Sequence, residues 1–401
     1  MDKHPKGKSN KLPISKPFVR NDFTWLAYVM LAYFAYLQAS FGPLMPFLRT
    51  ELHLSYTIGS LHVSAFALGM VLAGLFGDRL AHRWGRRLVF WGGAVGMAAG
   101  AALFTLGHQA VLTISSAFLM GVSGALLLVM IQAALSDQHS EQRIVALTEA
   151  NVVASIGAGL APVLIGGFQN VGASWRGAIF VAIALLAVIA VRWWRAAIPE
   201  MQEDTPEEGS KTRRLPLAFW VYWAALVCCV SIEWCVVVWS ADFLKEVGRL
   251  SSSVAATTVG LFFVAEVVSR LAGSRLSRVI PGTKLLLIAL AITTVGFPLF
   301  WLSPLTPLSI IGLFVAGLGI ANLFPLTLAV AVGIAPRQTN VASARLSFAG
   351  GFAIFTAPLV LGWFADSIGI QHAFGLVILL LIGAIGLTLL ANRLAPRQKG
   401  I

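Results

Sequence analysis

The stretch Ala373–Ala391, AFGLVILLLIGAIGLTLLA, decides the kind of fold that this sequence can adopt. It contains no charged side chain, and its apolar residues would surround a helix on every side instead of following one stripe. A helix needs roughly 20 such residues to cross a hydrocarbon core about 30 Å thick. The stretch is therefore predicted to be a membrane-spanning helix.

The composition of the whole chain points the same way. Of its 401 residues, 58% are hydrophobic and only 11% are charged, and the mean hydropathy is +0.82. Soluble proteins carry about 25% charged residues, so a water-soluble fold of this size could not cover its surface. Apolar runs recur without the strict alternation of β-barrel strands. We therefore predict an all-α integral membrane protein with spans at residues 23–48, 56–80, 87–107, 110–135, 142–168, 176–196, 215–242, 252–273, 284–303, 307–333, 339–367 and 372–392.

The distribution of basic residues predicts the orientation. The formal net charge is +12, and the Lys and Arg residues gather in alternate loops. Basic loops remain on the cytoplasmic side of a membrane. The pattern therefore favours a multi-pass protein of the cell (inner) membrane with both termini in the cytoplasm, and not a partner of nucleic acid. The cytoplasmic loops would hold Arg79, Arg83, Arg86, Arg87, Arg275, Arg278 and Lys284, and the outer loops Arg49, Arg176, Lys245 and Arg249.

One long polar stretch, residues 197–214, divides the chain almost equally. It predicts a cytoplasmic linker between two domains. The expected organisation is a basic cytoplasmic tail (1–22), an N-terminal six-helix bundle (23–196), the linker (197–214), a C-terminal six-helix bundle (215–392) and a second cytoplasmic tail (393–401).

The two parts of the chain are also related to each other. A shift of 196 residues aligns them without a gap. Two parallel repeats of six helices imply a pseudo-two-fold axis along the membrane normal, with a solute site at the interface of the repeats. The matched positions include Leu54-Ser55 with Leu250-Ser251, Gly77 with Gly273, Arg79 with Arg275, Gly121 with Gly317, Ala161-Pro162 with Ala357-Pro358, and Gly166 with Gly362.

The segment Gly74–Arg87, GLFGDRLAHRWGRR, resembles the loop signature between the second and third helices of the major facilitator superfamily. The resemblance extends over about residues 23–392. It departs from the family in one respect: Gly85 follows Asp78 by seven residues instead of the usual three, which one extra helical turn would explain. The resemblance implies twelve helices in two bundles, with the first, fourth, seventh and tenth lining a cavity.

A few ionisable residues lie inside the predicted spans, where each needs a partner or a water-filled cavity. A lone carboxylate in a low dielectric can bind and release a proton near neutral pH. Glu233 has no basic residue within two turns on its span, so we expect it to carry proton coupling, with Glu266 as a second candidate. The alternatives are a Glu233 that stays protonated or is hydrated outside the membrane, and a structural pair of Glu266 with Arg270. The full set is Glu149, Glu233, Glu266, Arg270 and Arg345.

Polar residues on other spans are candidates for the substrate cavity. Tyr33 and Gln38 lie on the first span, and Asn322 lies on the tenth, beside Pro325. With Glu233 they are expected to face the solute. Asn322 could equally bond a neighbouring helix, and Pro325 is expected to kink its own helix.

Charged residues near the cytoplasmic side predict a gate. The resemblance implies that the fifth and eighth helices, and the second and eleventh, pack together across the halves. We therefore expect two clusters, Glu149 with Arg270 and Asp78 with either Arg345 or the N-terminus of the eleventh helix, and we assign Arg79 to the same gate. These clusters would hold the cytoplasmic side shut in the outward-open state and break on inward opening.

These features together predict a secondary active transporter of a small organic solute. We expect proton coupling and alternating access, with a preference for efflux by antiport. The alternatives are a proton-coupled uptake symporter of an organic solute, anionic solutes included, a lipid flippase, or a non-transporting membrane sensor. The sequence contains no P-loop, HExxH or GxSxG motif, and its cysteines and histidines lack metal-ligand spacing. It therefore predicts no enzyme activity, cofactor or metal, and the expected partners are solute, protons and lipid around a monomer.

Overall fold

The computed structural model describes residues 18–200, 215–336 and 338–395 of the chain. The predicted tails and linker lie largely outside these residues. Helices form nearly all of the described part, as predicted. The N-terminal bundle contains α1 (Asp22–Ala39), α2 (Phe41–Leu52), α3 (Tyr56–Trp84), α4 (Arg86–Leu106), α5 (Ala110–Gln138), α6 (Arg143–Asn170) and α7 (Arg176–Trp193), with a short 3₁₀ turn, Ser140–Gln142, between α5 and α6.

The C-terminal bundle repeats this order. It contains α8 (Leu217–Glu246), α9 (Ser252–Leu276), α10 (Gly282–Leu302), α11 (Thr306–Ile320), α12 (Leu323–Gly333), α13 (Thr339–Ile368), α14 (Ile370–Ala373) and α15 (Gly375–Leu394). Eleven segments of the described residues are long and apolar enough to cross a membrane. The pair α1 and α2 supplies the first of the twelve predicted spans, divided in two.

Both divided spans have proline just after the break. Pro43 has no N–H for the carbonyl of Ala39, and α1 ends at that residue. The tenth span is interrupted between Ile320 and Leu323, and Pro325 follows in the first turn of α12. The predicted kink at Pro325 is therefore present as a full break between α11 and α12.

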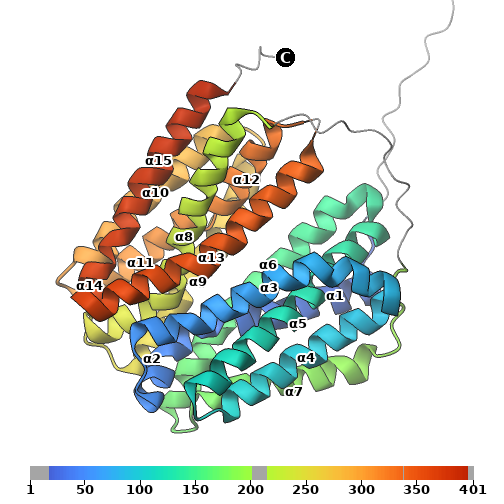
Figure 1. The fold of residues 1–401 in the computed structure, drawn as a ribbon, viewed down its shortest axis with the longest axis horizontal. Helices are drawn as coiled ribbons and strands as arrows, with labels where there is room; N and C mark the ends of the chain where they lie inside the picture. Colours follow the sequence, from blue (N-terminus) through green and yellow to red (C-terminus); the bar gives the residue numbers. More distant parts are fainter. Residues whose placement is uncertain (1–17, 201–214, 337, 396–401) are drawn as a thin grey trace, which may run out of the picture.

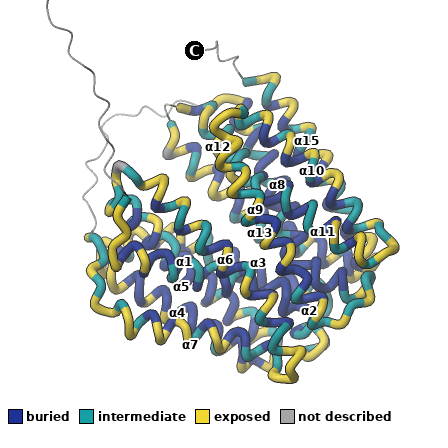
Figure 2. Tube along the Cα trace, turned by 180° about the vertical axis from the view of Figure 1, so that it is seen from behind, coloured by how far each residue is buried: buried dark blue, intermediate teal, exposed yellow. Residues whose placement is uncertain are grey.

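The two bundles touch mainly along three pairs of helices, with a smaller contact of α2 on α9. The helix α6 packs on α9, α3 packs on α13, and α2 packs on α8. We call the end where α7 ends and α8 begins the linker end, and the end with the α2–α3 and α8–α9 loops the opposite end. The bundles meet near α2 at the opposite end and diverge toward the linker end (Figure 1). Buried residues fill each bundle, and exposed residues lie on the outer surface (Figure 2). The exposed residues include apolar ones such as Val191 and Ile144, as lipid contact requires.

The internal repeat has a structural counterpart at the bundle interface. Gly166 on α6 lies against Ser253 and Thr257 of α9, so that an added Cβ would be 2.5 Å from the Ser253 carbonyl oxygen. Its repeat partner Gly362 on α13 lies against Tyr56 of α3 in the same way, at 2.8 Å from the carbonyl oxygen. Both bundles therefore approach each other through a glycine at the opposite end, because only a residue without Cβ allows such close helix contact.

The close approach at Gly166 yields a first prediction. Gly166→Ala should force α6 and α9 apart, because the new methyl group would meet backbone atoms that cannot rotate away. Overpacking of this kind costs about 1–3 kcal/mol, so the melting temperature of the purified protein in detergent should fall. Gly167→Ala is the matched control, because a Cβ at Gly167 has no atom within 4 Å. Equal melting temperatures for the two variants would contradict the prediction.

Candidate functional site

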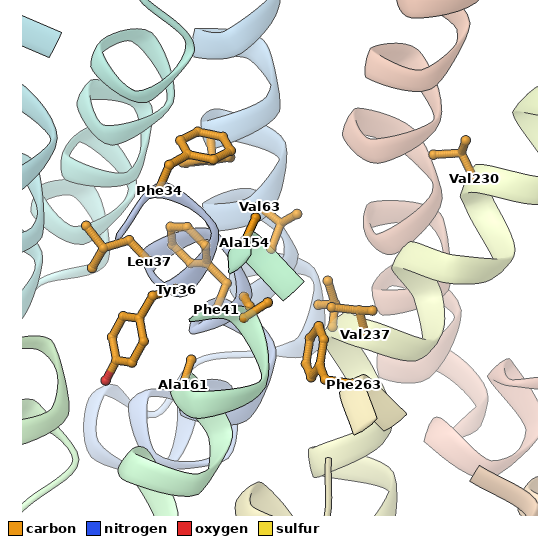
Figure 3. Packing of buried hydrophobic residues seen from close by; sticks show 14 of the residues in the cluster. Phe34, Tyr36, Leu37, Phe41, Val63, Ala154, Ala161, Val230, Val237 and Phe263 are labelled. Carbon is orange, nitrogen blue, oxygen red and sulfur yellow. The ribbon is translucent and has the colours of Figure 1, made fainter. Parts of the chain in front are cut away.

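A cavity of about 250 Å³ lies between the two bundles. Helices α1, α5 and α6 line it from the N-terminal bundle, and α8 and α9 line it from the C-terminal bundle. Phe34 and Ala154 come from the first bundle, and Val237 and Phe263 from the second, where the bundles meet (Figure 3). The remaining lining residues are Leu31, Ala35, Gln38, Ala39, Leu128, Gln132, Asn151, Ser155, Ala158, Glu233, Trp234, Glu266 and Arg270.

The polar groups of the cavity differ between its two sides. The N-terminal bundle contributes neutral side chains only, the amides of Gln38, Gln132 and Asn151 and the hydroxyl of Ser155. All three charged lining residues come from the C-terminal bundle, and they are two carboxylic acids and one guanidinium. With both acids ionised the lining carries one net negative charge.

Glu266 and Arg270 form the ion pair that their spacing predicts. The Arg270 Nη2 lies 3.5 Å from the Glu266 Oε1 one turn earlier on α9. Arg270 also donates through Nη1 to the Ser155 hydroxyl of α6, at 2.8 Å. The Glu266 side chain is 5% exposed and that of Arg270 is 38% exposed. The guanidinium therefore links the two bundles at the cavity wall and still reaches the cavity.

Glu233 lines the same cavity from α8. The charged groups that act on it are Glu266 and Arg270 of α9. Within the described residues, its half-buried carboxylate makes no hydrogen bond and no ion pair. Glu233 is thus a carboxylate without a partner at the interface of the bundles, where the sequence predicted a proton-binding acid.

The structure separates the other cavity candidates. Gln38 lines the cavity, and its amide makes a weak contact with the Met70 sulfur at 3.8 Å. Tyr33 does not line it: the side chain is buried in the N-terminal bundle, and its hydroxyl lies 3.4 Å from the Ala94 carbonyl oxygen. The physical reason is helical periodicity, because Tyr33 is five residues from Gln38 and so points to a different face of α1.

Asn322 is also absent from the cavity lining. It occupies the break between α11 and α12, where its amide donates to the Ser269 carbonyl at 3.0 Å and to the Ser269 hydroxyl at 2.8 Å. Ser269 in turn donates to the carbonyl of Leu318. Asn322 therefore bonds a neighbouring helix, which is the alternative stated above. Such a bond is expected because the backbone groups freed at the break need polar partners inside their own bundle.

The predicted gate residues do not contact each other across the bundles here. Glu149 accepts from Arg20 at 2.6 and 2.8 Å and from the Tyr28 hydroxyl at 3.0 Å, all within the N-terminal bundle. It does not pair with Arg270. Asp78 is 85% exposed and, among the described residues, approaches only His82, at 3.9 Å, and both Arg79 and Arg345 are exposed. This is the arrangement expected when the bundles diverge at the linker end.

A second set of polar contacts closes the opposite end. Arg49 of α2 forms an ion pair with Asp242 of α8 at 2.5 Å, and its guanidinium carbon lies 3.4 Å from the ring centre of Tyr56. Asp242 is fully buried. Lys245 of α8 extends from the C-terminal bundle to the N-terminal one, where its ammonium group donates to the Thr50 hydroxyl of α2 at 2.9 Å.

Helices α3 and α13 are joined at the same end. Asp366 of α13 accepts from the backbone N–H groups of Tyr56 and Thr57, at 2.7 and 2.8 Å, and so caps the first turn of α3. Further along, Ser60 and Ser64 donate to the backbone carbonyls of Pro358 and Phe355. The opposite end is therefore sealed by hydrogen bonds between the bundles.

This seal is not predicted from the sequence, although one signal of it is present there. The charge pattern places Arg49 and Lys245 in outer loops and assigns them no partner. The repeat shift of 196 residues places Lys245 on Arg49, so the two basic residues are equivalent positions of the two halves. Each reaches the other bundle at the end of its first spanning segment.

Comparison with known proteins identifies the family. A sequence profile of the Major Facilitator Superfamily matches residues 24–306 and 236–400. The chain belongs to the major facilitator superfamily. It is also similar to an uncharacterized MFS-type transporter of Yersinia pestis, with 24% identity over 355 residues that cover 86% of this chain and 89% of the other.

Solved structures of superfamily members share the fold. A bacterial homolog of the human lysosomal transporter Spinster, in an inward-facing and occupied conformation, has a TM-score of 0.77 at 15% identity, over 92% of this chain and 96% of that one. A D-xylose–proton symporter has a TM-score of 0.74 at 16% identity, over 94% and 98%. This superfamily member is therefore a membrane transporter and not an enzyme, and its fold is the predicted pair of six-helix bundles.

Proposed function

We propose that the protein is a proton-coupled secondary transporter that exports a small organic solute in exchange for protons. The observation that carries this proposal is the unpaired carboxylate of Glu233 in a cavity between the two bundles. An acid in a membrane interior marks a proton or substrate pathway unless a partner neutralises it. Glu266 has such a partner in Arg270, at 3.5 Å, whereas Glu233 has none among the described residues.

The cavity residues then have distinct roles. Glu233 binds the transported proton. The pair of Glu266 and Arg270 holds a fixed charge beside it, and the Arg270 bond to Ser155 of α6 transmits the state of the cavity to the opposite bundle. Protonation of Glu233 removes one negative charge from the lining. A proton and a solute that binds the ionised carboxylate of Glu233 therefore compete for the same group. This competition supports exchange in opposite directions over symport.

Alternating access follows from the two ends of the molecule. The protein spans the cell (inner) membrane with both termini on the cytoplasmic side. The sealed opposite end then faces outward, and the diverging linker end faces inward. On closure of the linker end, we propose that Glu149 exchanges Arg20 for Arg270, and that Asp78 and Arg79 approach Arg345. The exposure of Asp78 and Arg345 and the intrabundle pairing of Glu149 support this assignment of the present state as inward-facing.

The direction of the proton movement tests the proposed exchange. Candidate solutes are first found by thermal shift, because a ligand of the native state raises its melting temperature. The purified protein is then placed in liposomes that contain a pH-sensitive dye. A gradient of a solute that binds should drive protons in the opposite direction. Protons that follow the solute would overturn exchange and identify an uptake symporter, and solute movement without protons would overturn proton coupling.

A further inference from the structure

The charges and rings of the cavity define a class of solute. We propose that the cavity selects small organic cations, held by the carboxylate of Glu233 beside the ring of Trp234. This inference rests on the proposed transport through the same cavity. It adds the chemical class of the solute, which neither the fold nor the relatives indicate.

The charge of the lining is the first argument. Its charged members are Glu233, Glu266 and Arg270, so one negative charge remains when both acids are ionised. Arg270 already binds the Glu266 carboxylate and the Ser155 hydroxyl. Its guanidinium is therefore not a free binding site for an anionic solute. Among the described residues, Glu233 is the one member of this set without an ion-pair partner. A cationic solute would supply that partner, whereas an anionic solute would meet an unbalanced carboxylate.

The aromatic side chains supply the second argument. Trp234 follows Glu233 on α8 and lines the cavity, together with Phe34 of α1 and Phe263 of α9. Ring faces attract a desolvated cation, and Trp does so most strongly. The amides of Gln38, Gln132 and Asn151 on the other wall are neutral, so they can orient polar groups of a solute without repelling its charge.

The surroundings of Glu233 leave it free for such a ligand. Helices α2, α9, α11, α12, α13, α14 and α15 pack on α8. Of these, α9 brings Glu266 and Arg270, the charged groups that act on Glu233. Arg49 of α2 is already paired with Asp242 at the opposite end. Arg345 of α13 is exposed and does not line the cavity.

The volume sets the size. An apolar cavity of about 150 Å³ accepts benzene, so a cavity of about 250 Å³ fits a single ring with a short charged substituent. We therefore choose three probes of similar size and different charge. They are benzyltrimethylammonium, which is a permanent cation, N,N-dimethylbenzamide, which is neutral, and phenylmethanesulfonate, which is a permanent anion.

Binding of the three probes to the purified wild-type chain tests the proposal by quenching of tryptophan fluorescence and by calorimetry. The cation should bind at least about tenfold more tightly than the neutral probe, and the anion should bind most weakly. Acidification should weaken binding of the cation only, because Glu233 then carries a proton. Equal affinities, a preference for the anion, or a cation affinity that acid leaves unchanged would overturn the proposal.

Two variants of α8 locate the site. Glu233→Gln should lower the affinity for benzyltrimethylammonium about tenfold or more and leave that for N,N-dimethylbenzamide unchanged. Glu246→Gln removes a charge from the same helix outside the cavity and should change neither affinity. An unchanged cation affinity in Glu233→Gln would overturn the assignment. Tight binding at Glu233 without proton exchange in liposomes would sustain cation selectivity and reject the proposed function alone.

Discussion

Glu233→Gln is expected to abolish accumulation of solute against its gradient, while downhill exchange continues at solute concentrations that offset the lower affinity of the variant. A glutamine keeps the size and polarity of the side chain but cannot carry the proton. A difference of about one pH unit supplies about 1.4 kcal/mol per proton, which drives about tenfold accumulation in a coupled transporter. In the variant the ratio of internal to external solute should fall to about one. The measurement is uptake of labelled solute into inverted vesicles or proteoliposomes under an imposed pH gradient.

The same helix offers the control for this experiment. Glu246→Gln removes a carboxylate from the end of α8, where Glu246 is half-exposed and lies 3.9 Å from Lys245. It should retain full accumulation. Glu266→Gln should retain part of it, because that acid is paired with Arg270 and serves as a fixed charge. If Glu233→Gln accumulates solute as the wild type does while Glu266→Gln does not, the proton site is Glu266.

The fold was readable from the sequence because its main causes are local. A run such as Ala373–Ala391 cannot avoid lipid, and its residues form a helix irrespective of their neighbours. The breaks at Ser40 and Asn322 were harder to predict. Proline marks both of them, but whether a proline kinks or interrupts a helix depends on partners for the freed backbone groups, and Ser269 provides that partner at Asn322.

The cavity was predictable only as far as helical periodicity reaches. Leu31, Ala35 and Gln38 line it at the spacing of one helix face. That face excludes Tyr33, so the assignment of Tyr33 to the cavity ignored a constraint that the sequence contained. Helical periodicity cannot predict the pairing of Glu149 with Arg20, because Arg20 lies just before α1 and 129 residues away from its partner. Only the packing of α1 on α6 brings these two residues together.

The contacts at the opposite end depend on distances that no sequence pattern encodes. Arg49 and Asp242 are 193 residues apart, and each lies at the edge of a predicted span. The repeat relates Arg49 to Lys245, which marks both positions as special. It does not reveal their partners, because the halves differ there: Arg49 meets an acid on α8 whereas Lys245 meets the hydroxyl of Thr50.

Asp242→Asn should open the opposite end of the transporter. In the sealed state Arg49 is 15% exposed and Asp242 is not exposed at all, so removal of the carboxylate leaves a nearly buried cation. Breaking a buried ion pair in this way costs about 3–5 kcal/mol. The penalty applies only while the end is sealed, because both side chains reach water once α2 and α8 separate. A penalty of about 3 kcal/mol would shift the ratio of the two states about 100-fold toward the one that is open at the opposite end.

Spin labels can measure this shift directly. Val171 and Leu305 are exposed at the opposite end, one in each bundle, and suit labelling in a background without the three native cysteines. Pulsed electron–electron distances between them should lengthen in Asp242→Asn and return to wild-type values when Arg49→Asp is combined with Asp242→Arg. The ring of Tyr56 stabilises the Arg49 guanidinium in either state, so it reduces the shift without reversing it. Distances that stay unchanged in Asp242→Asn would show that the hydrogen bonds between α3 and α13 seal this end without the ion pair.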